Sequence, residues 1–227
     1  LLSSFWALNF SLAWQQALRI MEMFLLFFVL YLGPLSKKEI IRWFILGSVI
    51  PIIFGLYQFI FQFTFSNKYL GLSIHPIWEA GSSVVVGSFG RLLRSYGSFS
   101  HPNIFGGYLL VVLLASFLFF KNYKNNPWLV YSFNGILLLT MFFTFSRSAL
   151  IATLFLLIGF LIFSLKTKNQ KIKKISIFSL VLFFVLLFSL WSIFQSRFFS
   201  GSINETNSIE ERVSGFSQAL DLWQGNK

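Results

Sequence analysis

The stretch that decides the fold is WLVYSFNGILLLTMFFTF (Trp128–Phe145), followed by SRS (Ser146–Ser148) and ALIATLFLLIGFLIFSL (Ala149–Leu165). Each apolar run approaches the roughly 20 residues that an α-helix needs to cross the hydrocarbon core of a membrane. Only a short polar segment separates the two runs, so the chain must reverse direction within a tight turn. The stretch therefore predicts two adjacent membrane-spanning helices with Arg147 at the turn between them.

The composition of the whole chain also indicates a membrane protein. Hydrophobic residues make up 56% and charged residues 11% of the 227 residues, and the mean hydropathy is +0.74. A soluble domain has about 45–50% apolar and about 25% charged residues. The net charge of +11 does not indicate a nucleic-acid partner here, because the cations stand in short loops beside apolar runs. The absence of cysteine excludes disulfides and thiolate metal sites.

Further apolar runs extend the pattern, so the predicted fold class is all-α, a polytopic transmembrane bundle of about six spans with external loops. The expected spans are Leu18–Leu32, Trp43–Phe65 with a kink at Pro51, Asn103–Phe120, Trp128–Phe145, Ala149–Leu165 and Ile175–Phe194. Leu1–Gln16 is interpreted as the tail of an earlier span or as an interfacial helix. Residues 1–194 would form the membrane domain, and residues 195–227 would begin a large external loop.

The segment after the last span predicts an amphipathic helix. Its apolar residues recur at helical spacing, at Ile209, Val213, Phe216, Leu220 and Trp223. Ser208 and Glu211 match the S-x-x-E capping box that starts a helix. Such a helix would lie on the membrane surface or cover the external mouth of the bundle. Because the chain lacks an initiator Met and its pattern is still open at Lys227, we expect it to be part of a longer protein.

The cations divide between the two sides of the predicted membrane. If the six spans alternate in direction, three loops on one side hold Lys37, Lys38, Arg42, Lys121, Lys124, Lys166, Lys168, Lys171, Lys173 and Lys174. The positive-inside rule makes this side cytoplasmic. The opposite side holds the arginines Arg91, Arg94, Arg147, Arg197 and Arg212.

Arginine on the external side has two possible explanations. It can snorkel to lipid phosphate or neutralise helix carbonyls, which are structural roles. It can also grip phosphate oxygens in pairs, because the guanidinium presents a rigid fork of donors and keeps its charge. Arg147 is the strongest functional candidate, because a short turn between two spans holds it near the bundle axis. The external carboxylates show no metal-ligand spacing, so no metal or other cofactor is expected.

The two histidines, His75 and His101, stand in loops beside prolines. A lone loop histidine is usually solvated, so neither is assigned as a general base. His101 or Ser100 is expected near the cap of the helix that Pro102 opens. Asn103 is a candidate for a hydrogen bond that cross-links helices.

Three segments resemble the O-antigen ligase and O-antigen polymerase family of bacterial membrane proteins. They are R-x-x-G-x-F-x-H-P-N (Arg94–Asn103), T-F-S-R-S-A-L (Thr144–Leu150) and E-R-V-S-G-F-S-Q-A-L-D-L-W (Glu211–Trp223). The resemblance covers roughly Leu18 to the end of the chain, and the order and spacing of the segments carry it.

The resemblance implies a metal-independent glycosyltransferase at the outer face of the bacterial cytoplasmic membrane. Its donor would be a glycan on a polyprenyl-diphosphate carrier, and its acceptor another glycan or the lipid A core. Arg94, Arg147 and Arg212 match the motif arginines and would bind the donor diphosphate, while Arg91 is a secondary candidate and Arg197 does not clearly match. The catalytic residue stays unknown, because the histidine that the resemblance implies would lie beyond Lys227.

Two other classes of function stay open. Some relatives of this family have been described as bicarbonate or organic-anion transporters, and the external arginines would then form an anion vestibule. A transporter should show internal repeats and polar or broken helices near the membrane midplane. The spans here are strongly apolar, and their polar residues are only Gln58, Gln62, Asn134 and scattered Ser and Thr. This lack of polar residues near the midplane favours the enzyme over the transporter. The third class is a structural membrane subunit.

Overall fold

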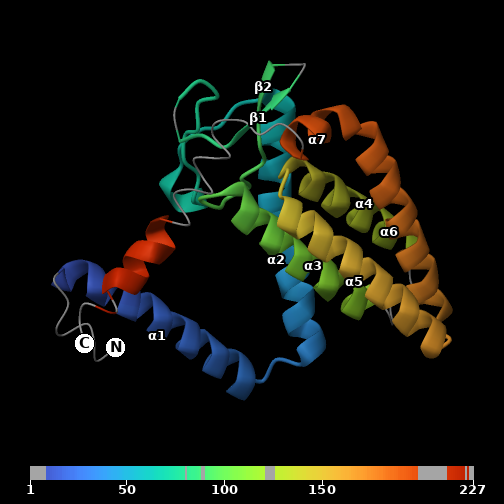
Figure 1. The fold of residues 1–227 in the computed structure, drawn as a ribbon. Helices are drawn as coiled ribbons and strands as arrows, with labels where there is room; N and C mark the ends of the chain where they lie inside the picture. Colours follow the sequence, from blue (N-terminus) through green and yellow to red (C-terminus); the bar gives the residue numbers. More distant parts are fainter. Residues whose placement is uncertain are drawn as a thin grey trace.

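Helices dominate the computed structural model, which describes residues 9–79, 81–87, 90–120, 126–198, 214–222 and 224 (Figure 1). They are α1 (Phe10–Leu32), α2 (Lys37–Phe61), α3 (Pro102–Phe120), α4 (Pro127–Phe143), α5 (Arg147–Lys166), α6 (Gln170–Ser189) and α7 (Trp191–Phe198). Five of them, α1, α2, α3, α5 and α6, are long and apolar enough to cross a membrane, and α4 is a shorter apolar helix of 17 residues. The protein is therefore an all-α multi-pass membrane protein, as the sequence predicts.

Three helices begin earlier than the predicted spans. α1 begins at Phe10, α2 at Lys37 and α6 at Gln170. The prediction that Leu1–Gln16 is separate from the first span is wrong for residues 10–16, which continue into α1. The last predicted span is also wrong at its end, because α6 stops at Ser189 and a separate helix, α7, follows.

The early starts have a common physical cause. The added turns contain charged residues in α2 and α6 and the polar residues Ser11, Gln15 and Gln16 in α1, all of which lower hydropathy. Lys, Arg, Glu and Gln are nevertheless among the better helix-forming residues. Each start has a polar N-cap whose side chain accepts a backbone N–H, namely Asn9, Ser36 and Asn169. Hydropathy therefore locates the part of each helix that lies in hydrocarbon, whereas capping and helix propensity determine where the helix begins.

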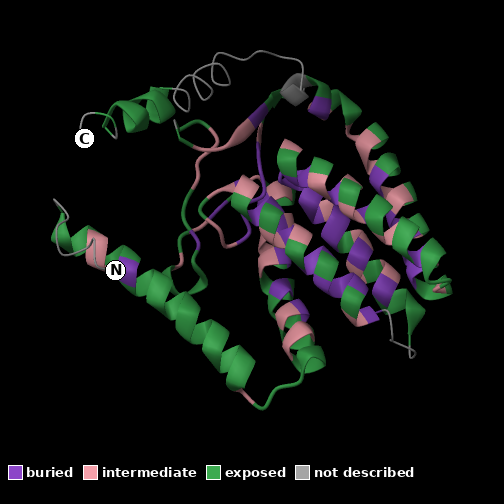
Figure 2. Cartoon of the chain, turned by 60° about the horizontal axis from the view of Figure 1, so that its bottom comes forward, coloured by how far each residue is buried: buried purple, intermediate pink, exposed green. Residues whose placement is uncertain are grey.

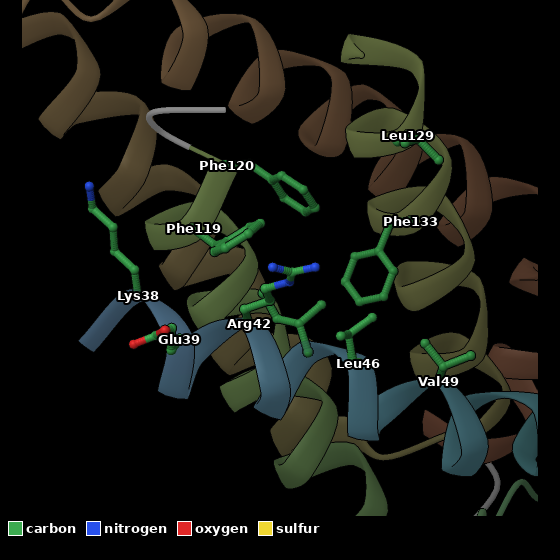
Figure 3. A pocket seen from close by; sticks show the side chains of 10 residues that line it. Lys38, Glu39, Arg42, Leu46, Val49, Phe119, Phe120, Leu129 and Phe133 are labelled. Carbon is green, nitrogen blue, oxygen red and sulfur yellow. The ribbon is translucent and has the colours of Figure 1, made fainter. Parts of the chain in front are cut away.

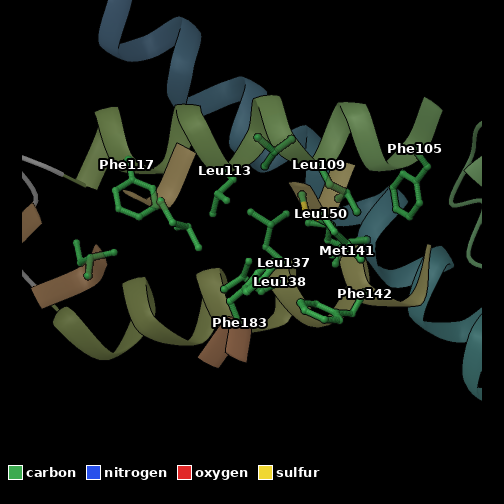
Figure 4. Close-up of a cluster of buried hydrophobic side chains, with 14 of the residues drawn as sticks. Phe105, Leu109, Leu113, Phe117, Leu137, Leu138, Met141, Phe142, Leu150 and Phe183 are labelled. Atoms are coloured by element: carbon green, nitrogen blue, oxygen red, sulfur yellow. The ribbon is translucent and has the colours of Figure 1, made fainter. Parts of the chain in front are cut away.

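The apolar core lies among α3, α4, α5 and α6 (Figure 4). One side of α3 carries fully buried side chains that meet those of α4, with Leu150 of α5 and Phe183 of α6 beside them. The α3 and α4 residues are Phe105, Leu109, Leu113, Phe117, Leu137, Leu138, Met141 and Phe142. Because lipid tails are as apolar as these side chains, helix association depends on close packing and on interhelical hydrogen bonds.

One such hydrogen bond joins α3 to α4. The Ser116 hydroxyl donates to Asn134 Oδ1 at 2.8 Å, and Asn134 Nδ2 donates to the Val130 carbonyl oxygen, also at 2.8 Å. Both Ser116 and Asn134 are completely buried. An interhelical bond of this kind stabilises a membrane protein by about 0.6 kcal/mol. Asn134, one of the few polar residues in the predicted spans, therefore has a structural role.

α1 is joined to α2 by residues Gly33–Ser36 and points away from the other helices (Figures 1 and 2). Ala17 is the buried residue along it, and its other described side chains are partly or fully exposed. An apolar helix with this exposure is suited to contact with lipid or with further transmembrane helices.

The two ends of the bundle differ in chemistry. The "lysine end" contains the starts of α2 and α6 and the end of α5 (Figure 1). Its described cations are Lys37, Lys38, Arg42, Lys166, Lys168, Lys171, Lys173 and Lys174, as the predicted partition requires, while Lys121 and Lys124 lie outside the described residues. The "β-hairpin end" contains the antiparallel strands β1 (Val84–Gly87) and β2 (Gly90–Leu93) and the turn between α4 and α5.

Candidate functional site

Arg94 lies at the centre of the β-hairpin end. It directly follows β2, and only 2% of its surface is exposed. Its Nε donates to the Thr144 carbonyl oxygen at 2.7 Å, and its Nη2 donates to Asn103 Oδ1 at 2.6 Å. Arginine is almost never fully buried unless it is paired. Arg94 thus joins three segments that are far apart in the sequence: the end of β2, the start of α3 and the α4–α5 turn.

The residues after Arg94 are held against α2 by Gln58. Its Oε1 accepts from the backbone N–H groups of Tyr96 and Gly97, both at 2.9 Å. Its Nε2 donates to the Gly97 carbonyl oxygen at 2.8 Å. The side chain is 4% exposed, so these bonds satisfy polar groups that are out of contact with solvent. Gln58 is one of the few polar residues in the predicted spans, and its role depends on these tertiary contacts.

Ser95 completes the attachment of this segment. Its backbone N–H donates to the Phe143 carbonyl oxygen at 2.9 Å, at the end of α4. Its hydroxyl donates to the Gly55 carbonyl oxygen of α2 at 2.7 Å. One short segment is therefore bonded to α2 and to α4 as well as to α3, and its position depends on all three helices.

The α4–α5 turn has an uncommon backbone conformation. Phe145 has φ = 47° and is completely buried. A bulky residue in the left-handed region is strained and persists only where its surroundings enforce it. Here the ring of Phe145 lies 4.9 Å from that of Phe194 and 5.8 Å from that of Phe59, between centroids. This aromatic packing holds Phe145 in its strained conformation.

Arg147 is the first residue of α5, and its side chain is half-buried. The preceding Ser146 is the N-cap, and its side chain accepts from Ala149 N at 3.5 Å. A cation at a helix N-terminus opposes the helix dipole by about 0.3–1 kcal/mol. Neutralisation of its own helix's carbonyls therefore does not explain Arg147, because those carbonyls face the other end of α5.

Gly106 allows α3 to approach this turn closely. A Cβ atom at Gly106 would lie 2.9 Å from Ala149 Cβ, 3.2 Å from Ser146 Cβ and 3.2 Å from Thr144 Oγ1. The first turns of α3, which continue from the segment Arg94–Asn103, therefore pack against the segment Thr144–Leu150 with no side chain at Gly106 between them.

His101 acts as the helix cap that the sequence predicts. Its Nδ1 accepts from Asn103 N at 3.1 Å, and its Nε2 lies 3.1 Å from Ser83 Oγ. Because Nδ1 is an acceptor, the proton of the neutral ring is on Nε2, which then donates to the serine. In this tautomer His101 cannot remove a proton from Ser83, so the geometry does not support a serine nucleophile activated by this histidine.

His75 stacks on Tyr96, with ring centroids 3.9 Å apart and an angle of 9° between the rings. Burial lowers the pKa of His75 from its ordinary value of about 6.5. The neutral ring is therefore favoured in the folded loop. Its contribution to stability is present above about pH 6.5 and is lost as the pH falls through the lowered value.

We expect the loop around His75 to loosen on acidification from about pH 7.5 to about pH 5. Hydrogen exchange of the Thr64–His75 amides, corrected for intrinsic rates, should increase on acidification in the wild type. It should change less in His75→Phe, which keeps an aromatic ring over Tyr96 but cannot titrate. An equal increase in both proteins would contradict a role for His75.

The structure places the predicted diphosphate-binding residues in different settings. Arg94 and Arg147 belong to segments that it brings together. Arg91 is exposed on β2, opposite Val86. Arg212, with Ser208 and Glu211 of the predicted capping box, lies outside the described residues, and so does the side chain of Arg197. Part of the predicted amphipathic helix, residues 214–222, is helical and exposed.

The described residues contain no group of three or more His, Cys, Asp or Glu side chains that could hold a metal ion. Comparison of the chain with protein-family models, with curated proteins and with solved structures finds no match. The chemistry of the site must therefore be argued from its residues.

Proposed function

We propose that the chain contains the donor-binding part of a membrane glycosyltransferase. The enzyme would transfer a glycan from a polyprenyl-diphosphate carrier to an acceptor sugar, as O-antigen ligases and polymerases do. One observation carries the proposal: Arg94 bonds Asn103 and the Thr144 carbonyl, so the two motif segments form one unit at the β-hairpin end. An apolar helix bundle can form without contact between these two segments, so their contact is a specific feature of this fold.

Within this unit, we assign contact with the donor diphosphate to Arg147. Arg147 is the first residue of α5, and at the end of a membrane-spanning helix its cation would lie near the lipid headgroups, where a carrier diphosphate would also lie. At an effective dielectric constant near 20, one pair of unit charges at about 4 Å interacts by about 4 kcal/mol. A guanidinium can also form paired hydrogen bonds with phosphate oxygens and stabilise the diphosphate as it leaves. The mechanism needs no metal or cofactor.

Arg94 would position this unit, and Arg212 and the exposed Arg91 would add charge around the diphosphate. The positive-inside rule puts the lysine end in the cytoplasm, so the β-hairpin end would face the outer side of the bacterial cytoplasmic membrane. The acceptor would be a second carrier-linked glycan or the lipid A core. The proton acceptor is not assigned.

Replacement of Arg147 tests the proposal. We expect Arg147→Ala to lower glycan transfer by about 100-fold or more, the usual effect of removing one donor that stabilises developing negative charge. Arg147→Lys should recover part of the loss, because lysine restores the charge without the paired donors. Transfer would be measured in membranes containing the protein, with a labelled polyprenyl-diphosphate-linked glycan as donor.

Lys68→Ala is the matched control, because it removes an exposed cation from the loop that connects α2 to the β-hairpin. It should transfer glycan at the wild-type rate. If Arg147→Ala and Arg147→Lys both do so as well, Arg147 does not bind the diphosphate. An anion transporter would instead give Arg147-dependent uptake of labelled bicarbonate into proteoliposomes, without glycan transfer.

A further inference from the structure

A cavity of about 620 Å³ lies at the lysine end, between α2 and α4 with the end of α3 behind it (Figure 3). Its volume is within the range of about 300–1,000 Å³ that is usual for ligand sites. Most of its lining is apolar, from Ile45, Leu46, Val49, Phe119, Phe120, Leu129 and Phe133, and its charged residues are Lys38, Glu39 and Arg42. The cavity is therefore amphipathic, with its charges confined to the first turns of α2.

Arg42 extends into this cavity. Figure 3 shows its guanidinium between the rings of Phe119 and Phe133, whereas Lys38 and Glu39 point away from the aromatic rings. Within the described part of the chain the Arg42 guanidinium has no hydrogen-bond partner. A guanidinium carries five N–H donors, so Arg42 can donate hydrogen bonds to an anion.

Glu39, the nearest acid along α2, is bonded to another residue. It accepts from Ser36 N at 2.8 Å and from Ser36 Oγ at 2.7 Å, in the capping box that starts the helix. These bonds hold its carboxylate at the helix start, where Arg42 also interacts with it electrostatically. Lys38 and Arg42 together outweigh Glu39, so the charged part of the lining is net positive.

The position of Arg42 suits a lipid headgroup. It stands on the second turn of α2, and the lining residues Leu46 and Val49 follow it toward the middle of the helix. Along α2, a cation near the membrane interface is thus followed by apolar lining residues that extend over more than one helical turn. A phospholipid has the same order, with a phosphate at the interface and acyl chains below it.

We propose that this cavity binds one anionic phospholipid from the leaflet at the lysine end, with its phosphate on Arg42 and an acyl chain against Leu46, Val49 and Phe133. Charge complementarity selects the anionic lipid, because a net positive headgroup site with an apolar floor does not favour a zwitterionic lipid or free phosphate. The proposal does not depend on the glycosyltransferase function, since Arg42 lies at the opposite end of the bundle from Arg147.

The test is lipid retention by the full chain, reconstituted in nanodiscs of equal phosphatidylglycerol and phosphatidylcholine and then released for native mass spectrometry. The wild type should retain one phosphatidylglycerol in preference to phosphatidylcholine. Arg42→Gln should lower this retention about tenfold, the effect of losing charge-assisted hydrogen bonds to one phosphate. Lys168→Ala, which removes an exposed cation at the same end, should retain the lipid like the wild type.

A second variant keeps the test independent of the folding of Arg42→Gln. Leu46→Trp keeps the guanidinium but fills the cavity, so it should also lower phosphatidylglycerol retention. Retention of phosphatidylglycerol by both variants at the wild-type level would overturn the proposal. Equal retention of the two lipids by the wild type would overturn it as well, and so would displacement of the lipid by millimolar inorganic phosphate alone.

Discussion

Arg94→Met is expected to destabilise the protein more than any other single arginine replacement in the described part of the chain. The methionine fills much of the same volume but donates no hydrogen bond, so Asn103 Oδ1 and the Thr144 carbonyl oxygen lose their bonds to Arg94. A buried polar group that is left without a partner costs about 1–3 kcal/mol, and this cost applies in full at buried Thr144 and in part at half-buried Asn103. Thermal unfolding in detergent micelles, followed by circular dichroism, should show a clearly lower midpoint for the variant.

Arg91→Met is the matched control for this experiment. Arg91 lies three residues earlier, on β2, and its side chain is exposed. Replacement of an exposed residue usually changes stability by no more than about 0.5 kcal/mol. Equal midpoints for Arg94→Met and Arg91→Met would show that the two bonds of Arg94 do not stabilise the fold.

The result also affects how activity data on Arg94 are interpreted. A loss of glycan transfer in an Arg94 variant can come from displacement of the α4–α5 turn, because Arg94 bonds the Thr144 carbonyl. If an Arg147 variant keeps the wild-type midpoint of thermal unfolding, its loss of glycan transfer cannot be attributed to a displaced turn. The donor-binding proposal is therefore tested at Arg147, and Arg94 tests the architecture that presents it.

Gly106→Val is the second replacement with a large expected effect. A Cβ at Gly106 would meet Ala149 Cβ at 2.9 Å, closer than real Cβ atoms approach another atom, and the two methyl groups of valine add to the clash. Either α3 or the start of α5 must move. Inserting carbon atoms into a packed site of this kind costs about 1–3 kcal/mol. The shift would also displace Arg147 relative to Asn103, so glycan transfer should fall together with stability.

Gly107→Val controls for the change of residue type. Gly107 is the next residue of α3, it is exposed, and a Cβ there would have no atom within 4 Å. Both variants lose glycine and gain a β-branched residue in the same helix, so helix propensity changes equally. Unfolding by sodium dodecyl sulfate titration should separate the two. The close approach of α3 to α5 would be refuted by two variants that unfold alike.

Local features of the sequence were sufficient to predict most of the bundle. The apolar runs located the central part of α2 to α6, and His101 and Pro102 marked the start of α3, which the structure confirms. These features act within a few residues of the chain, through hydropathy and capping. The β-hairpin was not predicted, although Val84–Val86 followed by Gly87 and Gly90 is the usual signal for one.

The contacts that form the site could not be predicted in this way. Arg94 pairs with a carbonyl 50 residues later, and Gln58 pairs with backbone groups 38 and 39 residues later. A backbone carbonyl has no residue-specific signature in a sequence, so neither partner could be identified from residue types. The same is true of Gly106, whose importance depends on which residues of α5 happen to face it.

The sequence by itself thus determined that the protein crosses a membrane several times. It also indicated that most lysines, together with Arg42, stand at one end, and that Arg91, Arg94 and Arg147 stand at the other. Each of these properties follows from the preference of individual residues for hydrocarbon or for the interface. Only the tertiary structure decided that Arg94 is buried among protein acceptors while Arg147 begins α5 at the turn. Burial and hydrogen bonding depend on segments far apart in the chain, and they come together only when the helices pack.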